Sequence, residues 1–134
     1  MNAERTDKED YKHKDLSEKV IMAFYNVYNT LGYGFLEKVY ENALMIEFER
    51  IGLSVKAQWP IQVLYAGEIV GEYFADILVE GCIIVEIKAG KNLSLEHEAQ
   101  LLSYLKATQI EVGLLLNFGP KPEVKRKAFD NSRK

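Results

Sequence analysis

Three charged side chains interrupt segments that otherwise have the composition of buried β-strands. Asp76 lies within the apolar residues 73–79, and Glu86 and Lys88 follow four apolar residues at the end of residues 82–88. Ionised groups at the end of a buried strand are costly unless they are paired or bind a metal ion. Two carboxylates can hold Mg²⁺ while water and a substrate phosphate complete its coordination, and a nearby lysine can orient or help to deprotonate an attacking water. Phosphodiester cleavage uses such a set, whereas the competing interpretation is an ordinary Glu–Lys pair at a strand end.

Whether Asp76 and Glu86 share a site depends on the register of the hairpin between their strands. Directly opposed residues of an antiparallel pair lie on the same face, and a slip of one residue inverts that relation. A two-residue turn puts Asp76 opposite Val85, on the wrong face. A three-residue loop over residues 79–81 puts Asp76 opposite Ile84 and diagonal to Glu86. We therefore predict that loop, or an equivalent bulge.

The elements that must position these residues follow from the spacing of apolar side chains. Helical spacing predicts two helices before any strand, and each is followed by a glycine. Runs of β-branched and aromatic residues then predict four strands, followed by one helix and a last strand. The predicted helices cover residues 16–31, 35–51 and 94–108, and the predicted strands cover 55–58, 61–65, 69–79, 82–88 and 111–117. The order is ααββββαβ, an α/β fold with a mixed sheet flanked by helices, in which the crossover helix makes the last two strands parallel.

Two residues within the predicted strands indicate local irregularities. Pro60, after Trp59, indicates an edge strand or the start of a strand, because proline lacks the N–H group that a ladder requires. Gly71 lies inside a strand pattern and predicts a β-bulge. An exposed edge around Trp59 and Pro60 also offers a surface for a homodimer.

Length and composition place the chain among single-domain proteins. With 134 residues, 48% of them hydrophobic, we expect one domain over residues 1–134. Residues 1–14 form a charged leader without the apolar stretch of a secretory signal, and no later run approaches the roughly 18 apolar residues of a membrane span. The single cysteine, Cys82, fits a reducing compartment and is expected to be a buried small hydrophobe. These features predict a soluble, cytoplasmic protein without a membrane partner.

The distribution of charge limits how the chain can bind nucleic acid. The net charge of −3 gives no global attraction to phosphate, so binding must use a local basic surface or metal ions. Residues 120–134 carry six basic and two acidic side chains. We expect this tail and the leader to be flexible, and the tail is either a solvated end or an arm that touches phosphate.

Beyond the strand motif, the chain as a whole resembles a known family. Asp76 followed by Glu86 and Lys88 resembles the signature of the PD-(D/E)xK nuclease superfamily, whose core is restriction-endonuclease-like. Within it, the chain is similar to the small GxxExxY proteins from about Leu16 to Arg126. The matching motifs are Gly34 through Glu37 to Tyr40, Glu72 to Asp76, Val85 to Lys88, His97 through Gln100 to Tyr104, and Gly113 through Asn117 to Gly119. The proline of the superfamily's name is replaced by Ala75, a departure common in the superfamily.

The resemblance implies roles for the residues of the strand motif. Asp76 and Glu86 would be ligands of Mg²⁺ or Mn²⁺, and Lys88 would act on water or on the developing charge. Glu37 would match a helix-borne acidic residue that some members add to the metal site; the alternative is a first-turn glutamate that complements the helix dipole.

Three further residues acquire possible roles from the same resemblance. Gln100 and Tyr104 share a helix face and resemble a motif that supports the active site and contacts nucleic acid, although a helix-packing tyrosine beside a glutamine has the same spacing. Tyr40 lies one turn after Glu37 and faces either the same cleft or the core. His97 fits a helix-surface or capping role better than metal ligation.

Two functional hypotheses remain after this comparison. The first is a Mg²⁺-dependent nuclease that hydrolyses phosphodiester bonds in DNA or RNA. The alternative is a non-catalytic nucleic-acid or protein-interaction module that retains the nuclease fold. The complete set of Asp76, Glu86 and Lys88 favours the enzyme, and the sequence does not distinguish DNA from RNA.

Overall fold

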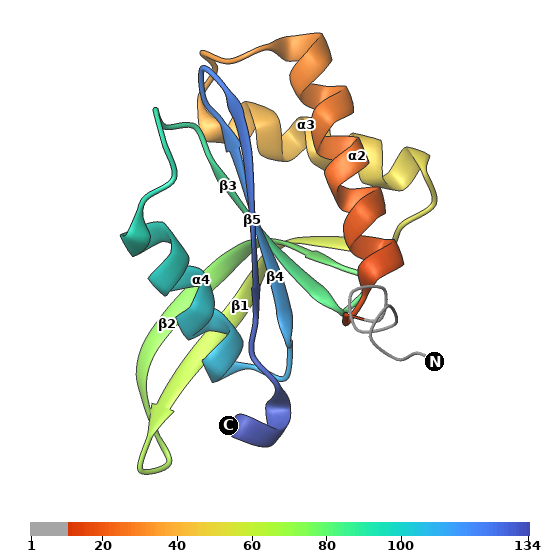
Figure 1. Cartoon of the computed structure of the whole chain (residues 1–134). Helices are drawn as coiled ribbons and strands as arrows, with labels where there is room; N and C mark the ends of the chain where they lie inside the picture. Colours follow the sequence, from red (N-terminus) through yellow and green to blue (C-terminus); the bar gives the residue numbers. More distant parts are fainter. Residues whose placement is uncertain (1–10) are drawn as a thin grey trace, which may run out of the picture.

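One mixed sheet with helices on both faces forms the protein in the computed structural model, which describes residues 11–134 (Figure 1). The strands lie in the order β1-β2-β3-β4-β5, and β3 and β4 are parallel whereas the other neighbours are antiparallel. The helices are α2 (Lys14–Leu31), α3 (Glu37–Arg50) and α4 (Leu95–Ala107), and the strands are β1 (Val55–Tyr65), β2 (Glu68–Val79), β3 (Ile83–Lys88), β4 (Val112–Phe118) and β5 (Pro122–Ala128); a short 3₁₀ helix, Asn131–Arg133, follows.

The sheet separates two hydrophobic cores. Alternate residues of β3 point to opposite faces: Ile83, Val85 and Ile87 pack with side chains of α2 and α3, whereas Ile84 packs with α4. Both β3 and β4 are covered on each face, and every residue of β4 is buried. This explains why their sequences are apolar without alternation. Figure 1 shows α4 on the side of the sheet opposite α2 and α3.

The three predicted helices are confirmed, and the predicted parallel pair is β3 with β4. The first helix ends where Gly32 adopts a φ of 69° and donates its N–H to the carbonyl of Tyr28, a conformation that glycine adopts at little cost. Among residues 11–134, no helix is long and apolar enough to span a bilayer. Of the predicted leader, residues 1–10 lie outside the described part of the chain.

The predicted order of the elements was wrong at two places, and the observed order is ααβββαββ. The residues 55–58 and 61–65 form a single strand, β1, which continues through Pro60. Because β1 is an edge strand, one side of its backbone needs no partner and proline is tolerated there. The expected flexible tail instead contains β5, which pairs with β4 along its whole length.

The predicted irregularity at Gly71 is confirmed. The partner of Val63 is Gly71, and the partner of Leu64 is Ile69, so the ladder skips Val70. The extra residue bends β2 at a point where it has left β3 and pairs only with β1. The hairpin of β1 and β2 therefore extends beyond the rest of the sheet, as Figure 1 shows.

Candidate functional site

The hairpin between β2 and β3 brings Asp76 and Glu86 together. Its loop has the predicted three residues but lies one position later than expected, because Val79 pairs with Ile83. The ladder ends with Ile77 paired to Val85, and one further step of the same register places Asp76 opposite Glu86. The predicted diagonal relation is thus replaced by direct opposition, which puts the two carboxylates closer than the sequence predicted.

Side chains replace the ladder hydrogen bonds at this step. The backbone N–H of Asp76 donates to Glu86 Oε2 at 2.8 Å, and the backbone N–H of Ile87 donates to Asp76 Oδ2 at 2.7 Å. Each carboxylate therefore has one oxygen fixed by a backbone N–H. The other oxygens, Asp76 Oδ1 and Glu86 Oε1, have no hydrogen-bond partner among residues 11–134, and neither is sealed from solvent.

The surroundings make the charged form of both acids unfavourable. Burial first and the charge of Asp76 second raise the pKa of Glu86 to about 8, and the residue is only 4% exposed. Burial also raises the pKa of Asp76, against the hydrogen bond from Ile87. Lys88 lowers the pKa of both groups, but less than burial raises it. The positive charge near Asp76 and Glu86 is thus too small to compensate their two negative charges, and a divalent cation would supply the missing charge.

Lys88 lies beside the two acids and contacts α4. Its Nζ donates to Gln100 Oε1 at 3.4 Å, a contact that joins the end of β3 to α4 and that the sequence analysis did not predict. Tyr104, one turn after Gln100, is buried and stacks at an angle against Tyr73, with ring centroids 5.7 Å apart. Burial and the charges of Glu86 and Asp76 raise the pKa of Tyr104 to about 12, so its hydroxyl stays protonated at neutral pH.

Two glutamates of α3, the predicted Glu37 and the unpredicted Glu41, lie close enough to the acid pair to affect its pKa values. Glu37 lies in the exposed first turn of α3, and its charge raises the pKa of both Asp76 and Glu86. Among the described residues, however, no three acidic, histidine or cysteine side chains form a group that could hold a metal ion. Glu41, one turn later, is 6% exposed and also raises the pKa of Asp76. Spacing of four residues from Glu37 was the signal that could have found it.

Tyr40 belongs to the core and does not face the cleft. It is 0% exposed and stacks on Phe118, with ring centroids 4.0 Å apart. Its hydroxyl donates to the carbonyl of Gly32 at 2.6 Å and accepts from the N–H of Phe35 at 3.2 Å. A fully buried side chain cannot contact nucleic acid, so of the two positions expected for Tyr40 the structure confirms the core and excludes the cleft. Tyr40 instead fixes the loop from which α3 and Glu37 begin.

A polar clamp that the sequence analysis missed holds the segment after Lys88. Asn117, which is fully buried, accepts from the N–H of Gly90 at 3.0 Å and donates to its carbonyl at 3.1 Å. Glu123 of β5 accepts from Asn117 Nδ2 and from the N–H of Leu93, both at 3.0 Å. The only signal was a polar residue at the end of an apolar strand. The clamp fixes the path from β3 to α4 and hence the approach of Lys88 to Gln100.

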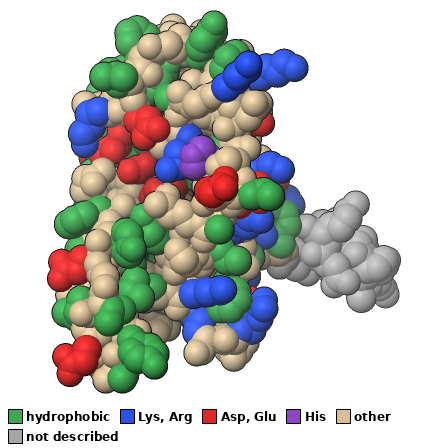
Figure 2. Space-filling view, turned by 90° about the vertical axis from the view of Figure 1, so that its left-hand side faces the viewer, with side chains coloured by type: hydrophobic (Ala, Val, Ile, Leu, Met, Phe, Trp, Pro, Cys, Tyr) green, Lys and Arg blue, Asp and Glu red, His purple; other side chains and the backbone are tan. Residues whose placement is uncertain are grey.

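The start of α4 is fixed by a reciprocal cap. Ser94 Oγ accepts from the N–H of His97 at 3.1 Å, and His97 Nδ1 accepts from the N–H of Ser94 at 3.2 Å. The predicted capping role of His97 is therefore confirmed. Figure 2 shows acidic, basic and histidine side chains gathered in the upper half of the face that carries α4.

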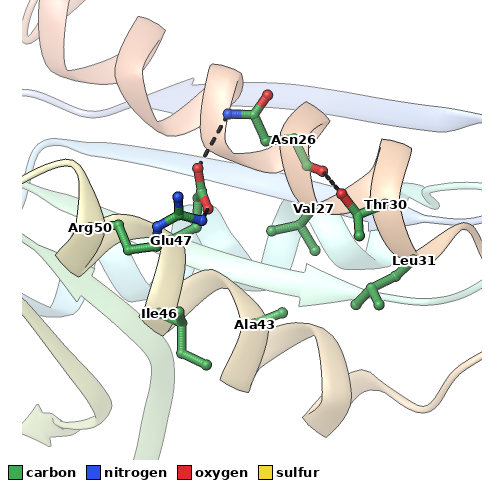
Figure 3. Close-up of a pocket in the computed structure, with 8 residues that line it drawn as sticks. All are labelled: Asn26, Val27, Thr30, Leu31, Ala43, Ile46, Glu47 and Arg50. Carbon is green, nitrogen blue, oxygen red and sulfur yellow. Dashed lines mark hydrogen bonds and ion pairs between the residues drawn. The ribbon is translucent and has the colours of Figure 1, made fainter.

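A groove on the other side of the molecule does not touch these residues. It has a volume of about 210 Å³ and lies between α2 and α3 (Figure 3). Its lining residues are Asn26, Val27, Thr30, Leu31, Ala43, Ile46, Glu47 and Arg50. Glu47 is held there by Asn26 at 3.2 Å and by Arg50 at 3.4 Å. Glu47 is the single acidic side chain among these lining residues, so the groove offers no pair of carboxylates that could hold a metal ion.

Comparison with known proteins identifies the class to which this fold belongs. Residues 14–127 match the family described as the PD-(D/E)XK nuclease superfamily, and the chain belongs to it. The matching family model corresponds to the GxxExxY proteins, as the motif from Gly34 to Tyr40 predicted. No curated protein matches the chain.

A solved structure with a similar fold supports the architecture. The structure titled "Crystal structure of SSO0001" aligns with a TM-score of 0.56 and 17% sequence identity, over 69% of this chain and 50% of that one. The chain thus spans half the length of that protein. At this identity the likeness concerns the fold alone.

Proposed function

We propose that the protein is a divalent-metal-dependent nuclease that hydrolyses phosphodiester bonds in DNA or RNA. The observation that carries this proposal is the opposition of Asp76 and Glu86, two largely buried carboxylates whose pKa values are lowered by Lys88 as the one cation among residues 11–134. A purely structural role would be served better by apolar residues, because two buried like charges destabilise a fold. Membership of the nuclease superfamily supports the same chemistry.

The donor set fits Mg²⁺ or Mn²⁺. Both ions prefer hard oxygen ligands, and Mg²⁺ is commonly held by one or two carboxylates, with water and substrate phosphate completing the octahedron. Asp76 and Glu86 each offer one oxygen that no backbone N–H occupies. A third protein ligand is unnecessary for such a site, so the position of Glu37 outside a ligand group is compatible with it.

Each residue has a distinct part in the proposed reaction. A bound divalent cation supplies Lewis-acid polarisation of the scissile phosphate. Asp76 and Glu86 would hold that cation, and the hydrogen bonds that they accept from backbone N–H groups keep the carboxylates in one orientation. Lys88, steadied by Gln100, donates a hydrogen bond to the attacking water or to a phosphate oxygen that gains negative charge. Tyr104 lies close enough to the pair for both charges to raise its pKa, so it adds a protonated hydroxyl to this region.

The test is cleavage of nucleic acids by the purified protein. Single- and double-stranded DNA and RNA are incubated with Mg²⁺ or Mn²⁺ and with EDTA. We expect metal-dependent cleavage of at least one substrate, and Lys88→Ala should lower its rate about a hundredfold or more while the protein remains folded. Lys106→Ala is the matched control, because Lys106 is an exposed lysine on the last turn of α4. Absence of cleavage together with absence of Mg²⁺ and Mn²⁺ binding would overturn the proposal.

A further inference from the structure

Gln58 has an unusual backbone conformation in the middle of β1. Its φ is 54°, in the left-handed region that non-glycine residues adopt at a cost of roughly 1 kcal/mol or more. The other non-glycine residues with positive φ in residues 11–134 are Ala66 and Glu80, which lie in hairpin turns, and His13, which precedes α2. A strained residue inside a strand needs a contact that holds it.

The strain coincides with a reversal of the faces of β1 and β2. Ala57 pairs with Ile77 and Trp59 pairs with Ala75, so Gln58 and Asp76 are the two residues left between these pairs. Residues two apart in a regular strand share a face. Ala75, however, packs in the core under α4, and Ile77 packs in the core under α2 and α3. Asp76 thus lies at the point where the side chains of β2 change from one face of the sheet to the other.

Glu41 supplies the contact that holds Gln58. Its Oε1 accepts from Gln58 Nε2 at 3.0 Å, and its Oε2 accepts from Lys38 Nζ at 3.0 Å. Glu41 is buried, whereas the side chain of Lys38 is 64% exposed, so this cation offsets little of the cost of burying the carboxylate. Glu41 also lies close enough to Asp76 for their charges to oppose each other.

We propose that Glu41 and Gln58 are a positioning pair that aims Asp76 at Glu86. The carboxylate of Glu41 holds Gln58 in the left-handed conformation. That conformation reverses which face of the sheet the following side chains of β1 and their partners in β2 point to. The reversal in turn directs Asp76 toward β3. The role of the pair in metal binding rests on the proposed function, but its effect on Asp76 does not. Glu41 acts through Gln58 and is not itself a metal ligand, since both its oxygens are engaged by side chains.

A rescue experiment tests this chain of contacts. Glu41→Ala removes the contact that holds Gln58, whereas Gln58→Gly makes the left-handed conformation inexpensive without any contact. We expect Glu41→Ala to weaken Mn²⁺ binding, measured by calorimetry, about tenfold, as the loss of a hydrogen bond to a charged group predicts. In the Gln58→Gly background the same substitution should change the affinity by no more than about twofold.

A second measurement does not depend on a metal ion. The N–H of Ile87 donates to Asp76 Oδ2, so its rate of hydrogen exchange reports the orientation of Asp76 in metal-free protein. Glu41→Ala should accelerate this exchange about tenfold, and Gln58→Gly should suppress the acceleration. The amide of Leu114, in the buried strand β4, should exchange at an unchanged rate, because the overall fold persists.

The outcomes separate the two proposals. If the wild type binds no Mn²⁺ but the exchange of Ile87 responds and is rescued, the positioning pair stands and the metal-dependent function fails. If Glu41→Ala acts equally in both backgrounds, Glu41 acts directly and the positioning pair is wrong. Glu47→Ala is the matched control, because Glu47 is a part-buried glutamate of α3 held by Asn26 and Arg50 in the groove of Figure 3. It should change neither measurement.

Discussion

At the scale of single residues, the buried pair of Asp76 and Glu86 destabilises the metal-free fold, and the proposed divalent cation would offset this destabilisation. Glu86 is buried beside Asp76, and the backbone hydrogen bond it accepts does not offset its loss of hydration. Active sites commonly contain groups that are unfavourable for folding, because their arrangement serves binding and not stability. The metal-free protein should therefore gain stability when one of these charges is removed.

This cost makes the stability of the metal-free protein depend on pH. The pKa of Glu86 rises from an ordinary 4.5 to about 8 on folding, so between these values the folded state holds a proton that the unfolded state has lost. Stability contributed by that proton is present below pH 4.5 and is lost as the pH rises through about 8, by at most about 1.4 kcal/mol per pH unit.

Glu86→Gln should remove this dependence. We expect the variant to be more stable than the wild type at pH 8.5 in EDTA, by a few kcal/mol, with a difference that shrinks toward pH 5. Urea unfolding across this range measures the difference. Mg²⁺ should raise the melting temperature of the wild type and leave that of the variant unchanged. Parallel pH profiles for the two proteins would contradict the prediction, and Glu96→Gln, an exposed change on α4, is the control.

At the scale of elements, the sequence predicted those with a strong periodic pattern. The three helices, the parallel pair and the odd loop before β3 followed from apolar spacing and from the need to put Asp76 and Glu86 on one face. The strand β5 was missed because three of its seven residues are basic and Val124 is its main apolar contact with the core. Its stabilisation comes from backbone pairing with β4, which side-chain patterns do not reveal.

The segment between β3 and α4 depends on one buried side chain. Asn117→Ala would leave the N–H and the carbonyl of Gly90 without their partner, and we expect a loss of about 2–4 kcal/mol in the free energy of unfolding. If the protein stays folded, cleavage should fall as well, because Lys88 is no longer held near Gln100. Chemical denaturation measures the loss. Asn92→Ala, an exposed change in the same segment, should have little effect.

Gly119 tests the same clamp by crowding it. A Cβ at this position would lie 2.3 Å from the carbonyl oxygen of Gly90 and 2.9 Å from Asn117 Nδ2. Gly119→Ala should therefore displace the clamp and destabilise the protein by about 1–3 kcal/mol. An alanine variant as stable as the wild type would show that this segment can move freely.

At the scale of the whole molecule, the site draws on residues from distant parts of the chain. Asp76, Glu86 and Lys88 could be predicted because they lie on adjoining strands and break an apolar pattern. Glu41 and Asn117 left only weak signals in the sequence, and their roles could not be predicted, because these depend on contacts with Gln58 and Gly90 that only the folded chain brings together. Sequence spacing thus predicted the candidate acids and lysine and missed the buried polar residues around them.

The basic C-terminal segment is the clearest case in which the whole fold changes an interpretation. Beyond the pairing of β5 with β4, Lys134 Nζ donates to the carbonyls of Thr108 and Ile110 at 2.8 and 2.9 Å, and the guanidinium of Arg133 lies over the ring of Phe129 at 4.4 Å. Residues 120–134 are thus joined to the sheet and to the end of α4. Their charged side chains therefore belong to a folded part of the protein and not to a flexible arm.

Removing residues 120–134 should therefore unfold the protein. The deletion exposes the edge of β4, whose residues are all buried, and it removes the Glu123 carboxylate from the clamp. We expect loss of cooperative thermal unfolding by circular dichroism, and aggregation on size-exclusion chromatography. The double variant Lys125→Gln and Lys127→Gln keeps the strand and removes two charges. It should fold normally and lower nucleic-acid affinity only if the strand touches phosphate. A deletion that folds and cleaves like the full chain would restore the interpretation of these residues as a dispensable arm.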